Sequence, residues 1–485
     1  MSNNSDKAPR VLAIVVNWNK KEFVESLLGQ LQNLDRPPDE IVVVDNASTD
    51  GSREMLERDY SHLHLVFNEE NLGGSGGFNT GLRWGLEHGG YDYFWLLDND
   101  VVVHDGALRA MLDLAQSDPQ IGMVGGRIVV LGHPELTQEI GARVEWPRCF
   151  LRKMGADWEN AQDRQKVYDV DYVAACSMMV RVKAVEEVGI WDSGYFVFFD
   201  DIEWGIRFRR AGWKVKATRD SVIEHDSFHE RRLKNKPGQD HLCLRNALFF
   251  MHQFCPRRIR PFFFLRVFRF IVQDALQQRL LGRINRARSQ ELAAWDFFRS
   301  RRGKSNRSFG LDTLAKEVSR DVQHLQEQLP GRKKRLLFWT YSAEADMLDR
   351  YHECCRIFPD YQVDIFTPEE CMDTLHFDAE PIIRRPTKNW RNRMKLSRWV
   401  LANYEAIVRE DQTNCMLWEF LLPAIIWYSS DGTFGIMRKK WSRFFWQIAL
   451  RPLVLASAFG LTVLEELKPR AKMDYYTWDS STKHK

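Results

Sequence analysis

Short apolar runs alternate with amphipathic stretches along the first hundred residues. Residues 11–16 and 41–44 are β-branched runs of the kind found in strands that are buried on both faces. Between them, residues 22–32 space their apolar side chains as a helix does, and a Pro-Pro pair at 37–38 ends the pattern. The alternation of strand and helix predicts an α/β domain with a parallel sheet.

A third apolar run, residues 63–67, leads into a glycine-rich stretch. Residues 71–79 (NLGGSGGFN) bring four glycines into five positions. We expect a loop that lets backbone approach a ligand closely, followed by a helix whose N-terminus faces phosphate or sugar oxygens. Glycine-rich loops are also common linkers, and no Walker sequence follows, so this stretch alone does not identify a site.

Residues 91–100 (YDYFWLLDND) form an apolar run that stops abruptly on two carboxylates. Such a run predicts a strand in the middle of a sheet, with Asp98 and Asp100 straddling its end. There both side chains can converge on one hard cation, for which oxygen ligands are preferred. A strand can also end in a polar Asp-Asn-Asp turn without any cation, so the pair alone leaves both interpretations open.

Polar residues follow several of these predicted strands. Asp45 ends the second strand, the glycine-rich stretch follows the third, and Asp98 and Asp100 end the fourth. Ligands of open α/β sheets bind beyond the carboxyl ends of the strands. We therefore expect these groups to face one crevice.

A second acidic group lies at residues 195–204 (YFVFFDDIEW), where an aromatic run ends on Asp200 and Asp201 and a helical pattern begins. An acid at a strand-to-helix junction can act as a general base beside a substrate hydroxyl. Acids in a first helical turn also favour the macrodipole, which is the structural alternative. His225 ends a further apolar run; most single histidines are structural, but an imidazole beside two carboxylates suits Mn²⁺ or Mg²⁺.

The composition is that of a globular protein. At 485 residues, with 44% hydrophobic and 28% charged side chains, the chain is long enough for two or three domains. Its polar N-terminus has no segment of signal-peptide type, so we expect a cytoplasmic protein. Eight scattered cysteines without a CxxC pair indicate free thiols rather than a zinc site or a disulfide framework.

The net charge of +3 conceals a basic segment. Residues 256–310 carry fourteen Arg and Lys against three acids, which gives +11, and phenylalanines are interleaved with the arginines. Such a mixture describes a nucleic-acid surface. In helical segments it equally describes an interfacial membrane helix with cations at the headgroups. Composition alone does not choose between them.

Six motifs together resemble a known family. Over residues 10–255 the chain resembles the family 2 glycosyltransferases, which are inverting nucleotide-sugar enzymes with a GT-A fold. The motifs occur in the family's order: VVNWN, VVVDNASTDGS, NLGGSGGFNTG, LLDND, FFDDIEWGIRFRRAGW and VIEHDSF. Within the family, GGSGGF, the acid pair, the later histidine and HLCLRN at 241–246 are most similar to galactofuranosyltransferases, followed by rhamnosyltransferases of cell-surface polysaccharide synthesis.

The resemblance implies a role for each matching residue. Asp201 would be the catalytic base, with Asp200 and Trp204 shaping the acceptor site. Asp45 would contact the uridine or its ribose. The metal, Mn²⁺ or Mg²⁺, would be held on the donor pyrophosphate by Asp98, Asp100 and His225. The donor site would comprise Asn17, Asp45, Gly74, Gly76, Asn79, Asp98 and Asn99. Asn17-Trp18-Asn19 departs from the aromatic-Asn pattern common in the family.

Three domains are predicted: a GT-A, Rossmann-like nucleotide-sugar-binding domain over 1–250, a basic-aromatic helical region over 251–330, and a C-terminal accessory domain over 331–485. Apolar runs at 336–341 and 363–366 indicate that the accessory domain is a small α/β unit or mostly helical. Residues 444–464 are apolar, but Gln447, Arg451 and Pro452 interrupt them, which favours a buried or interfacial helix over a membrane span.

The expected function is a metal-dependent inverting transferase, a hexosyltransferase that moves galactofuranose from UDP-galactofuranose to a lipid-linked glycan. The alternatives are a rhamnosyltransferase that uses dTDP-rhamnose and, in a different class, a non-catalytic glycan- or nucleotide-binding scaffold. Because such transferases act on lipid-pyrophosphate acceptors, the resemblance favours peripheral attachment to the inner face of the plasma membrane, at its anionic surface, over nucleic acid. The sequence does not decide the oligomeric state, and a homo-oligomer is one of the alternatives.

Overall fold

The computed structural model describes most of the chain, and every structural statement below concerns the described residues. These are residues 8–146, 150–155, 165–225, 237–280, 283–310, 329, 331–339, 345–366, 390–410, 422, 424–428, 434–438 and 449–468.

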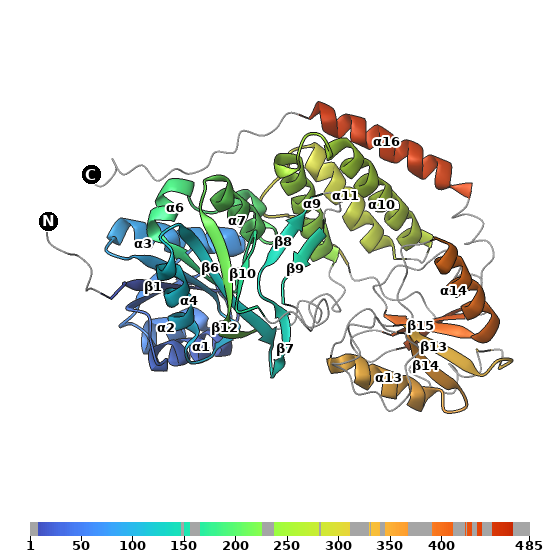
Figure 1. The fold of residues 1–485 in the computed structure, drawn as a ribbon, viewed down its shortest axis with the longest axis horizontal. Helices are drawn as coiled ribbons and strands as arrows, with labels where there is room; N and C mark the ends of the chain where they lie inside the picture. The colour runs from blue at the N-terminus through green and yellow to red at the C-terminus, as the bar shows by residue number, and fades with distance from the viewer. Residues whose placement is uncertain are drawn as a thin grey trace.

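A mixed sheet organises the N-terminal half (Figure 1). Its first four strands are parallel and lie side by side in the order β4-β1-β2-β3. Their bounds are Val11–Asn17 for β1, Glu40–Asp45 for β2, His64–Phe67 for β3 and Tyr93–Asp98 for β4. Because the strands are parallel, their carboxyl ends lie at one edge of the sheet, as the apolar runs predict.

The other half of the sheet is partly antiparallel. Strand β11 (Ser177–Arg181) runs antiparallel between β4 and β6 (Ile121–Val130), and β12 (Lys214–His225) runs parallel to β6. Three short strands complete it: β5 (Val101–Val103), β7 (His133–Glu139) and β10 (Val167–Asp169). A two-stranded sheet of β8 (Ala142–Glu145) and β9 (Phe150–Lys153) lies beside them.

Helices cover both faces of the large sheet because its strands bury side chains on both. On one face, Val11, Ala13 and Val15 pack with residues of α1 (Lys21–Asn33) and α4 (Ala107–Ser117). On the other, Leu12, Ile14 and Val16 pack with α3 (Gly73–His88), α6 (Val182–Val188) and α7 (Asp200–Arg210). A short helix, α2 (Ser52–Asp59), follows β2.

The glycine-rich stretch is helical, not a loop as expected. Helix α3 begins at Gly73, and its glycines at positions 77, 81 and 85 lie one turn apart on the face that meets β1. A Cβ on these residues would lie 2.6 Å from Val16, 2.3 Å from Ile14 and 2.7 Å from Leu12. The strand repeat of two residues matches the helical repeat of four, so the glycines let α3 approach the sheet closely.

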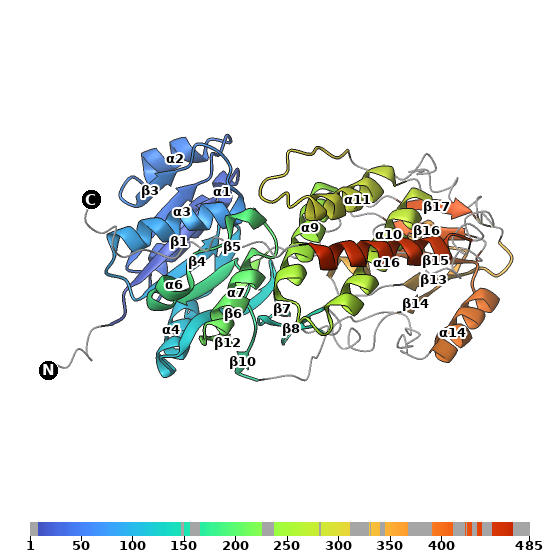
Figure 2. The same ribbon diagram turned by 90° about the horizontal axis from the view of Figure 1, so that it is seen from above.

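Three helices follow the sheet domain: α9 (Pro237–Phe254), α10 (Arg260–Leu280) and α11 (Ile284–Phe298). They share an aromatic core in which Phe264 stacks on Phe297 and Phe268 on Phe298. Helix α16 (Arg451–Leu467) comes from near the C-terminus and packs on α10 (Figures 1 and 2). Helices α10 and α11 lie within the predicted basic-aromatic region over 251–330, and much of their aromatic content is core, since Phe263, Phe264, Phe268 and Phe297 are buried.

A second, five-stranded sheet occupies the C-terminal part of the chain, in the order β14-β13-β15-β16-β17. Strands β13 (Arg335–Trp339), β14 (Gln362–Phe366), β15 (Ala406–Glu410) and β16 (Ala424–Tyr428) are parallel, and β17 (Phe434–Arg438) is antiparallel. The helices α13 (Ala345–Ile357) and α14 (Trp390–Asn403) accompany it. This unit is the small α/β region that the apolar runs at 336–341 and 363–366 indicate.

The predicted fold class is confirmed: a GT-A-like α/β domain with a mixed sheet is followed by helices and a smaller α/β unit. Five cysteines lie within the described part of the chain (176, 243, 255, 354 and 355), and all five are free thiols. The other three lie outside it. Among the described helices, none combines the length and hydropathy that crossing a bilayer requires.

Candidate active site

The carboxyl ends of β1, β2 and β4 are joined by side-chain hydrogen bonds. The Asn17 amide nitrogen donates to Asp45 Oδ1 (3.1 Å), and the Asn17 amide oxygen accepts from Asn99 (2.7 Å). Asp45 also accepts from the backbone N–H of Ser48 (2.9 Å). All three of Asn17, Asp45 and Asn99 are buried. The structure thus brings together three of the predicted donor-site residues from three separate strands.

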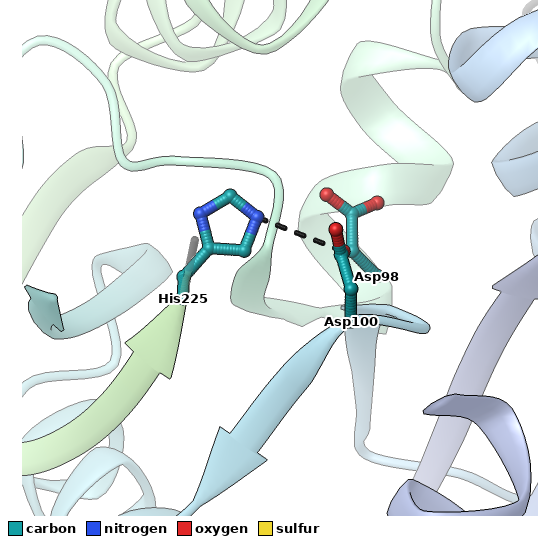
Figure 3. Close-up of side chains that lie close together, drawn as sticks. All are labelled: Asp98, Asp100 and His225. Carbon is teal, nitrogen blue, oxygen red and sulfur yellow. Dashed lines mark ion pairs between the residues drawn. The ribbon is translucent and has the colours of Figure 1, made fainter. Parts of the chain in front are cut away.

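The predicted metal ligands also meet. Asp98 ends β4, Asp100 follows two residues later, and His225 ends β12 on the far side of β5 (Figure 3). One ligand atom from each lies within 4.8 Å of the others, and His225 Nε2 is 3.7 Å from Asp100 Oδ1. Two carboxylate oxygens and an imidazole nitrogen suit Mn²⁺ or Mg²⁺, so this donor set fits the expected cation.

Lys20, which the sequence analysis does not single out, lies against this group. Its ammonium forms an ion pair with the buried carboxylate of Asp100. Lys20 immediately precedes α1, so the loop that follows β1 carries a cation to the end of β4. A divalent cation that binds Asp100 must therefore compete with an ammonium already on the protein.

Replacement of Lys20 by Met is expected to tighten Mn²⁺ binding. An ion pair with one partly exposed partner contributes roughly 1 kcal/mol, which corresponds to about fivefold in the dissociation constant. Isothermal titration of the full chain with MnCl₂ measures this directly. Lys21→Met removes the adjacent charge without touching Asp100 and serves as the control; equal tightening in both variants would mean that Lys20 acts only through the general field.

Asp200 and Asp201 follow a strained aromatic turn, not the strand end that the sequence predicts. Phe196, Phe198 and Phe199 all have positive φ angles (66°, 68° and 67°), and the preceding residues form a 3₁₀ turn, Ser193–Tyr195. Such conformations are costly for bulky residues and occur where the surroundings enforce them. The turn delivers Asp200 and Asp201 to the start of α7 and lies against the start of α3, where Ser75 donates its backbone N–H to the Phe196 carbonyl (3.3 Å).

The two acids hold protons more strongly than ordinary aspartates. Burial, reinforced by the neighbouring Asp201, raises the pKa of Asp200 well above its usual range. Burial raises the pKa of Asp201 to about 7, and the charge of Glu139 adds to this, whereas the backbone N–H of Ile202 opposes it. The Asp98 charge raises both pKa values, which shows that the acid pair and the metal ligands share one electrostatic environment.

Asn246 of α9 holds the aromatic turn. Its amide nitrogen donates to three carbonyl oxygens, those of Tyr195 (2.8 Å), Val197 (2.8 Å) and Phe198 (3.0 Å). Its own amide oxygen accepts from the Arg245 guanidinium at 3.0 and 3.1 Å. Asn246 and Arg245 are both buried. These bonds offset the backbone strain and fix the path that leads to Asp201.

Asn246→Leu is expected to lower kcat about 10- to 100-fold with little change in the donor KM. One buried carbonyl and two partly buried carbonyls would lose their donor, at a cost of roughly 1–3 kcal/mol for a buried group that stayed unsatisfied, so the turn would relax and Asp201 would shift. The donor side, at the ends of β1, β2 and β4, is not touched. Asn403→Leu, which removes a single local bond to Trp399, is the control. A rise in donor KM with unchanged kcat would contradict the positioning role.

Two predicted site residues, Asn79 and Trp204, are buried and bonded to backbone groups of the protein. Asn79 is buried, and its amide bonds the backbone N–H and C=O of Trp191 (2.9 and 2.8 Å), so it joins α3 to the segment before the aromatic turn. Trp204 is fully buried between Trp191 and Phe208 and donates to the Gly189 carbonyl. Trp204 is therefore packed inside the domain, and its expected role in shaping the acceptor site stays a prediction.

Of the two glycines predicted for the donor site, Gly74 and Gly76, only Gly74 has the acid pair as its nearest neighbour. A Cβ on Gly74 would lie 3.9 Å from Asp200 Oδ2, so Gly74 adjoins the acid pair. A Cβ on Gly76 would lie 2.5 Å from the Cβ of Leu72, the residue that precedes α3. The Glu139 carboxylate, which the sequence does not point to, is near enough to Asp201 to raise its pKa and is itself paired with Lys153 (2.8 Å).

The geometry can be compared with known proteins. Residues 13–189 match the family model described as "Glycosyl transferase family 2". Among curated relatives, the N-acetylglucosaminyl-diphospho-decaprenol L-rhamnosyltransferase of Mycobacterium tuberculosis is 23% identical over 236 residues, which covers 44% of this chain and 76% of the relative. The "Low-salt glycan biosynthesis hexosyltransferase Agl10" of Haloferax volcanii is 24% identical over 205 residues and covers 42% of this chain and 62% of the relative.

Poly-beta-1,6-N-acetyl-D-glucosamine synthase of Staphylococcus aureus is 22% identical over 221 residues, 44% of this chain and about half (49%) of that protein. Among solved structures, GalNAc-T7 with UDP, GalNAc and Mn²⁺ has a TM-score of 0.42 at 14% identity and covers 54% of this chain and 51% of that one. All these matches leave about half of the present chain uncovered.

Proposed function

Because residues 13–189 match the family 2 glycosyltransferase model, the predicted enzyme class, a hexosyltransferase, is confirmed, and we propose that the crevice between Asp98 and Asp201 is its active site. The observation that carries this proposal is the convergence of two constellations. The cation-binding group of Asp98, Asp100 and His225 comes from the ends of β4 and β12, the acid pair of Asp200 and Asp201 comes from the start of α7, and the Asp98 charge acts on both acids.

The donor occupies the strand-end side of the crevice. Asp45, Asn17 and Asn99 lie there as one hydrogen-bonded group, beside the cation-binding carboxylates. A divalent cation held by Asp98, Asp100 and His225 would supply Lewis acidity to the leaving diphosphate. These assignments to the base, ribose and pyrophosphate of a nucleotide sugar follow the motifs that the chain shares with the family.

The acceptor enters beside α7. Asp201 removes the proton from the attacking hydroxyl as the bond from that oxygen to the anomeric carbon forms and the bond to the diphosphate breaks. This single displacement inverts the anomeric configuration. A base with a pKa near 7 is well matched to the task, because it is ionised in part at neutral pH and still binds a proton strongly.

For the substrates, the proposal is transfer of galactofuranose from UDP-galactofuranose to a lipid-linked glycan during synthesis of a surface polysaccharide, at an anionic membrane surface. The GGSGGF and HLCLRN motifs support the donor. A second candidate is transfer of rhamnose from dTDP-rhamnose, since a relative covered over 76% of its length is named as a rhamnosyltransferase that acts on a decaprenyl-diphosphate glycan.

A donor screen tests the proposal. The full chain is incubated with MnCl₂, a short lipid-pyrophosphate glycan and either UDP-galactofuranose or dTDP-rhamnose, and the released nucleoside diphosphate is measured. Release with the first donor supports the primary proposal, and release with the second supports the alternative. Binding of a nucleotide sugar without release from either would favour the non-catalytic scaffold.

A further inference from the structure

Helix α16 is uncharged over most of its length. Residues 452–464 (PLVLASAFGLTVL) contain no charged side chain. One side of the helix, with Val454, Ala458 and Thr462, is buried, and Ala458 belongs to the aromatic core of α9, α10 and α11. The opposite side is exposed and consists of Leu453, Leu455, Phe459, Val463, Leu464 and Leu467, with Phe459 64% and Leu467 74% accessible. We call these six residues the outer face.

An exposed apolar helix face needs an explanation. Surface helices of soluble proteins place charged or polar residues opposite their buried stripe, and helices that are apolar all round are found in protein cores or against lipid. The six residues of the outer face all lie on one helix between positions 453 and 467, whereas exposed apolar residues on an ordinary surface are scattered singly.

Polar contacts fix the rotation of α16, so the outer face cannot turn inward. Glu465 is fully buried and accepts from His252 of α9 (2.6 Å). Glu466 binds the guanidinium of Arg260 on α10 in a bidentate pair (3.1 and 2.9 Å). Lys468 donates to Ser300, just beyond α11 (2.6 Å). One helical turn is thus tied to all three neighbouring helices.

Exposed aromatic and cationic side chains also lie on α10 and α11, the helices that pack with α16 in one core. Phe262, which is 77% exposed, lies two residues from Arg260, and the exposed Phe270 lies farther along α10, with Arg266 and Arg269 between them. The exposed Trp295 of α11 carries the Arg299 guanidinium over its ring at 5.4 Å. Aromatic rings mixed with arginines are typical of the headgroup layer of a bilayer.

We infer that the outer face of α16 docks on an anionic lipid bilayer, with its leucine and phenylalanine side chains at the acyl boundary and exposed arginines of α10 and the end of α11, Arg266, Arg269 and Arg299, at the headgroups. Helix α16 lies along the outer edge of the helical region in Figure 1 and in front of α10 in Figure 2, where a flat surface can reach it. A second copy of the chain fits less well, because it would bring two segments of +11 together.

The inference rests on the proposed function in one respect: docking would hold the enzyme at the membrane, where a lipid-linked acceptor is found. Helix α9 contacts α16 through His252 and the aromatic turn through Asn246. The docking face and the acid pair are therefore connected by one helix.

Vesicle flotation of the full chain tests the docking face. We expect the protein to float with vesicles of phosphatidylcholine and phosphatidylglycerol, and much less with phosphatidylcholine alone. The triple variant Leu455→Gln/Phe459→Gln/Leu464→Gln keeps good helix formers on α16 and should lower the bound fraction about tenfold or more, since each buried apolar side chain adds about a factor of ten in affinity. Phe23→Gln, an exposed phenylalanine on α1, should change nothing.

A second variant tests the charge contribution without touching α16. Arg266→Gln/Arg269→Gln should weaken flotation with anionic vesicles and reduce its salt dependence. The inference is overturned if the triple variant floats as well as the wild type. It is also overturned if the wild type stays with neither vesicle and instead sediments as a dimer that the triple variant loses, which would make the face a self-interface.

Failure of this inference can be told from failure of the proposed function. Nucleotide release with a water-soluble acceptor fragment reports the crevice and not the membrane, and the triple variant should retain it. A chain that floats but transfers no sugar would remove the proposed function and leave the docking face.

Discussion

Asp201→Asn is expected to reduce turnover by about 10²–10⁴-fold, which is the usual contribution of a positioned general base. The amide keeps the size of the side chain and its place at the start of α7 but cannot accept the proton of the acceptor hydroxyl. Turnover is measured as nucleoside diphosphate released with saturating donor. Asp220→Asn, an exposed acid of β12 paired with Lys166, is the control and should behave as the wild type.

The same variant should be more stable than the wild type in alkaline solution. Because the pKa of Asp201 is raised to about 7 in the folded protein, folding favours its protonated form. The stabilisation that accompanies a raised carboxyl pKa is complete below the unfolded value near 4 and is lost as the pH rises through about 7. Asn resembles the protonated acid, so the gain in Tm should be absent at pH 4 and present at pH 8.

The pH profile of kcat/KM should follow the same ionisation. An ionised Asp201 is required, so kcat/KM should rise with pH and level off above about 7 in the wild type. Asp201→Asn should flatten this limb. Unchanged turnover in a correctly folded Asp201→Asn would assign the base to another residue, with Asp200 as the first to examine.

Removal of divalent metal should have the second large effect. Chelation with EDTA is expected to lower turnover by about a thousandfold or more, because a Lewis acid on the leaving diphosphate stabilises the transition state by several kcal/mol. MnCl₂ or MgCl₂ should restore it. Asp100→Asn should lower both turnover and the affinity for Mn²⁺ measured by titration.

The matched control for Asp100→Asn lies at the other end of β4. Asp92 precedes that strand and accepts from the backbone N–H of Arg10 (2.8 Å), so Asp92→Asn keeps the strand and removes a charge at the opposite edge of the sheet. Turnover that persists after exhaustive chelation, with Mn²⁺ titrations that show no binding to the wild type, would contradict a cation role for Asp98, Asp100 and His225.

The sequence predicts the sheet and its functional edge well. Buried runs such as residues 11–16 and 93–97 predict strands because nearly every side chain in them is apolar. The carboxylates that follow such runs indicate the edge of the sheet at which we expect the crevice. The meeting of His225 with Asp98 and Asp100 follows from the resemblance, since neither spacing nor periodicity shows that β12 lies beside β5.

The sequence misleads where tertiary packing overrides local composition. Glycines at positions 73–77 have a poor intrinsic tendency to form a helix, yet Gly77 and Gly81 lie so close to Val16 and Ile14 that a glycine face is the one that fits. Phe196, Phe198 and Phe199 look like a strand, but Asn246, 47 residues after Phe199, bonds the turn and imposes positive φ angles. A tether so distant in the chain leaves no local signal.

The residues near the candidate site that the sequence did not identify all act through partners that are distant in the chain. Lys20, Asn246 and Glu139 act through partners that are remote in sequence, respectively Asp100, the 195–198 backbone and Asp201. Of the three, Asn246 falls in a motif that resembles the family, HLCLRN, and that motif was the available signal.

Asn246 and His252 lie six positions apart on α9. At a rise of 1.5 Å per residue they are about 9 Å apart along one helix, with the strained turn bonded to Asn246 and α16 bonded to His252. One helix therefore bonds both α16, which carries the outer face, and the turn that precedes Asp200 and Asp201, so a displacement of α9 would be felt at both places.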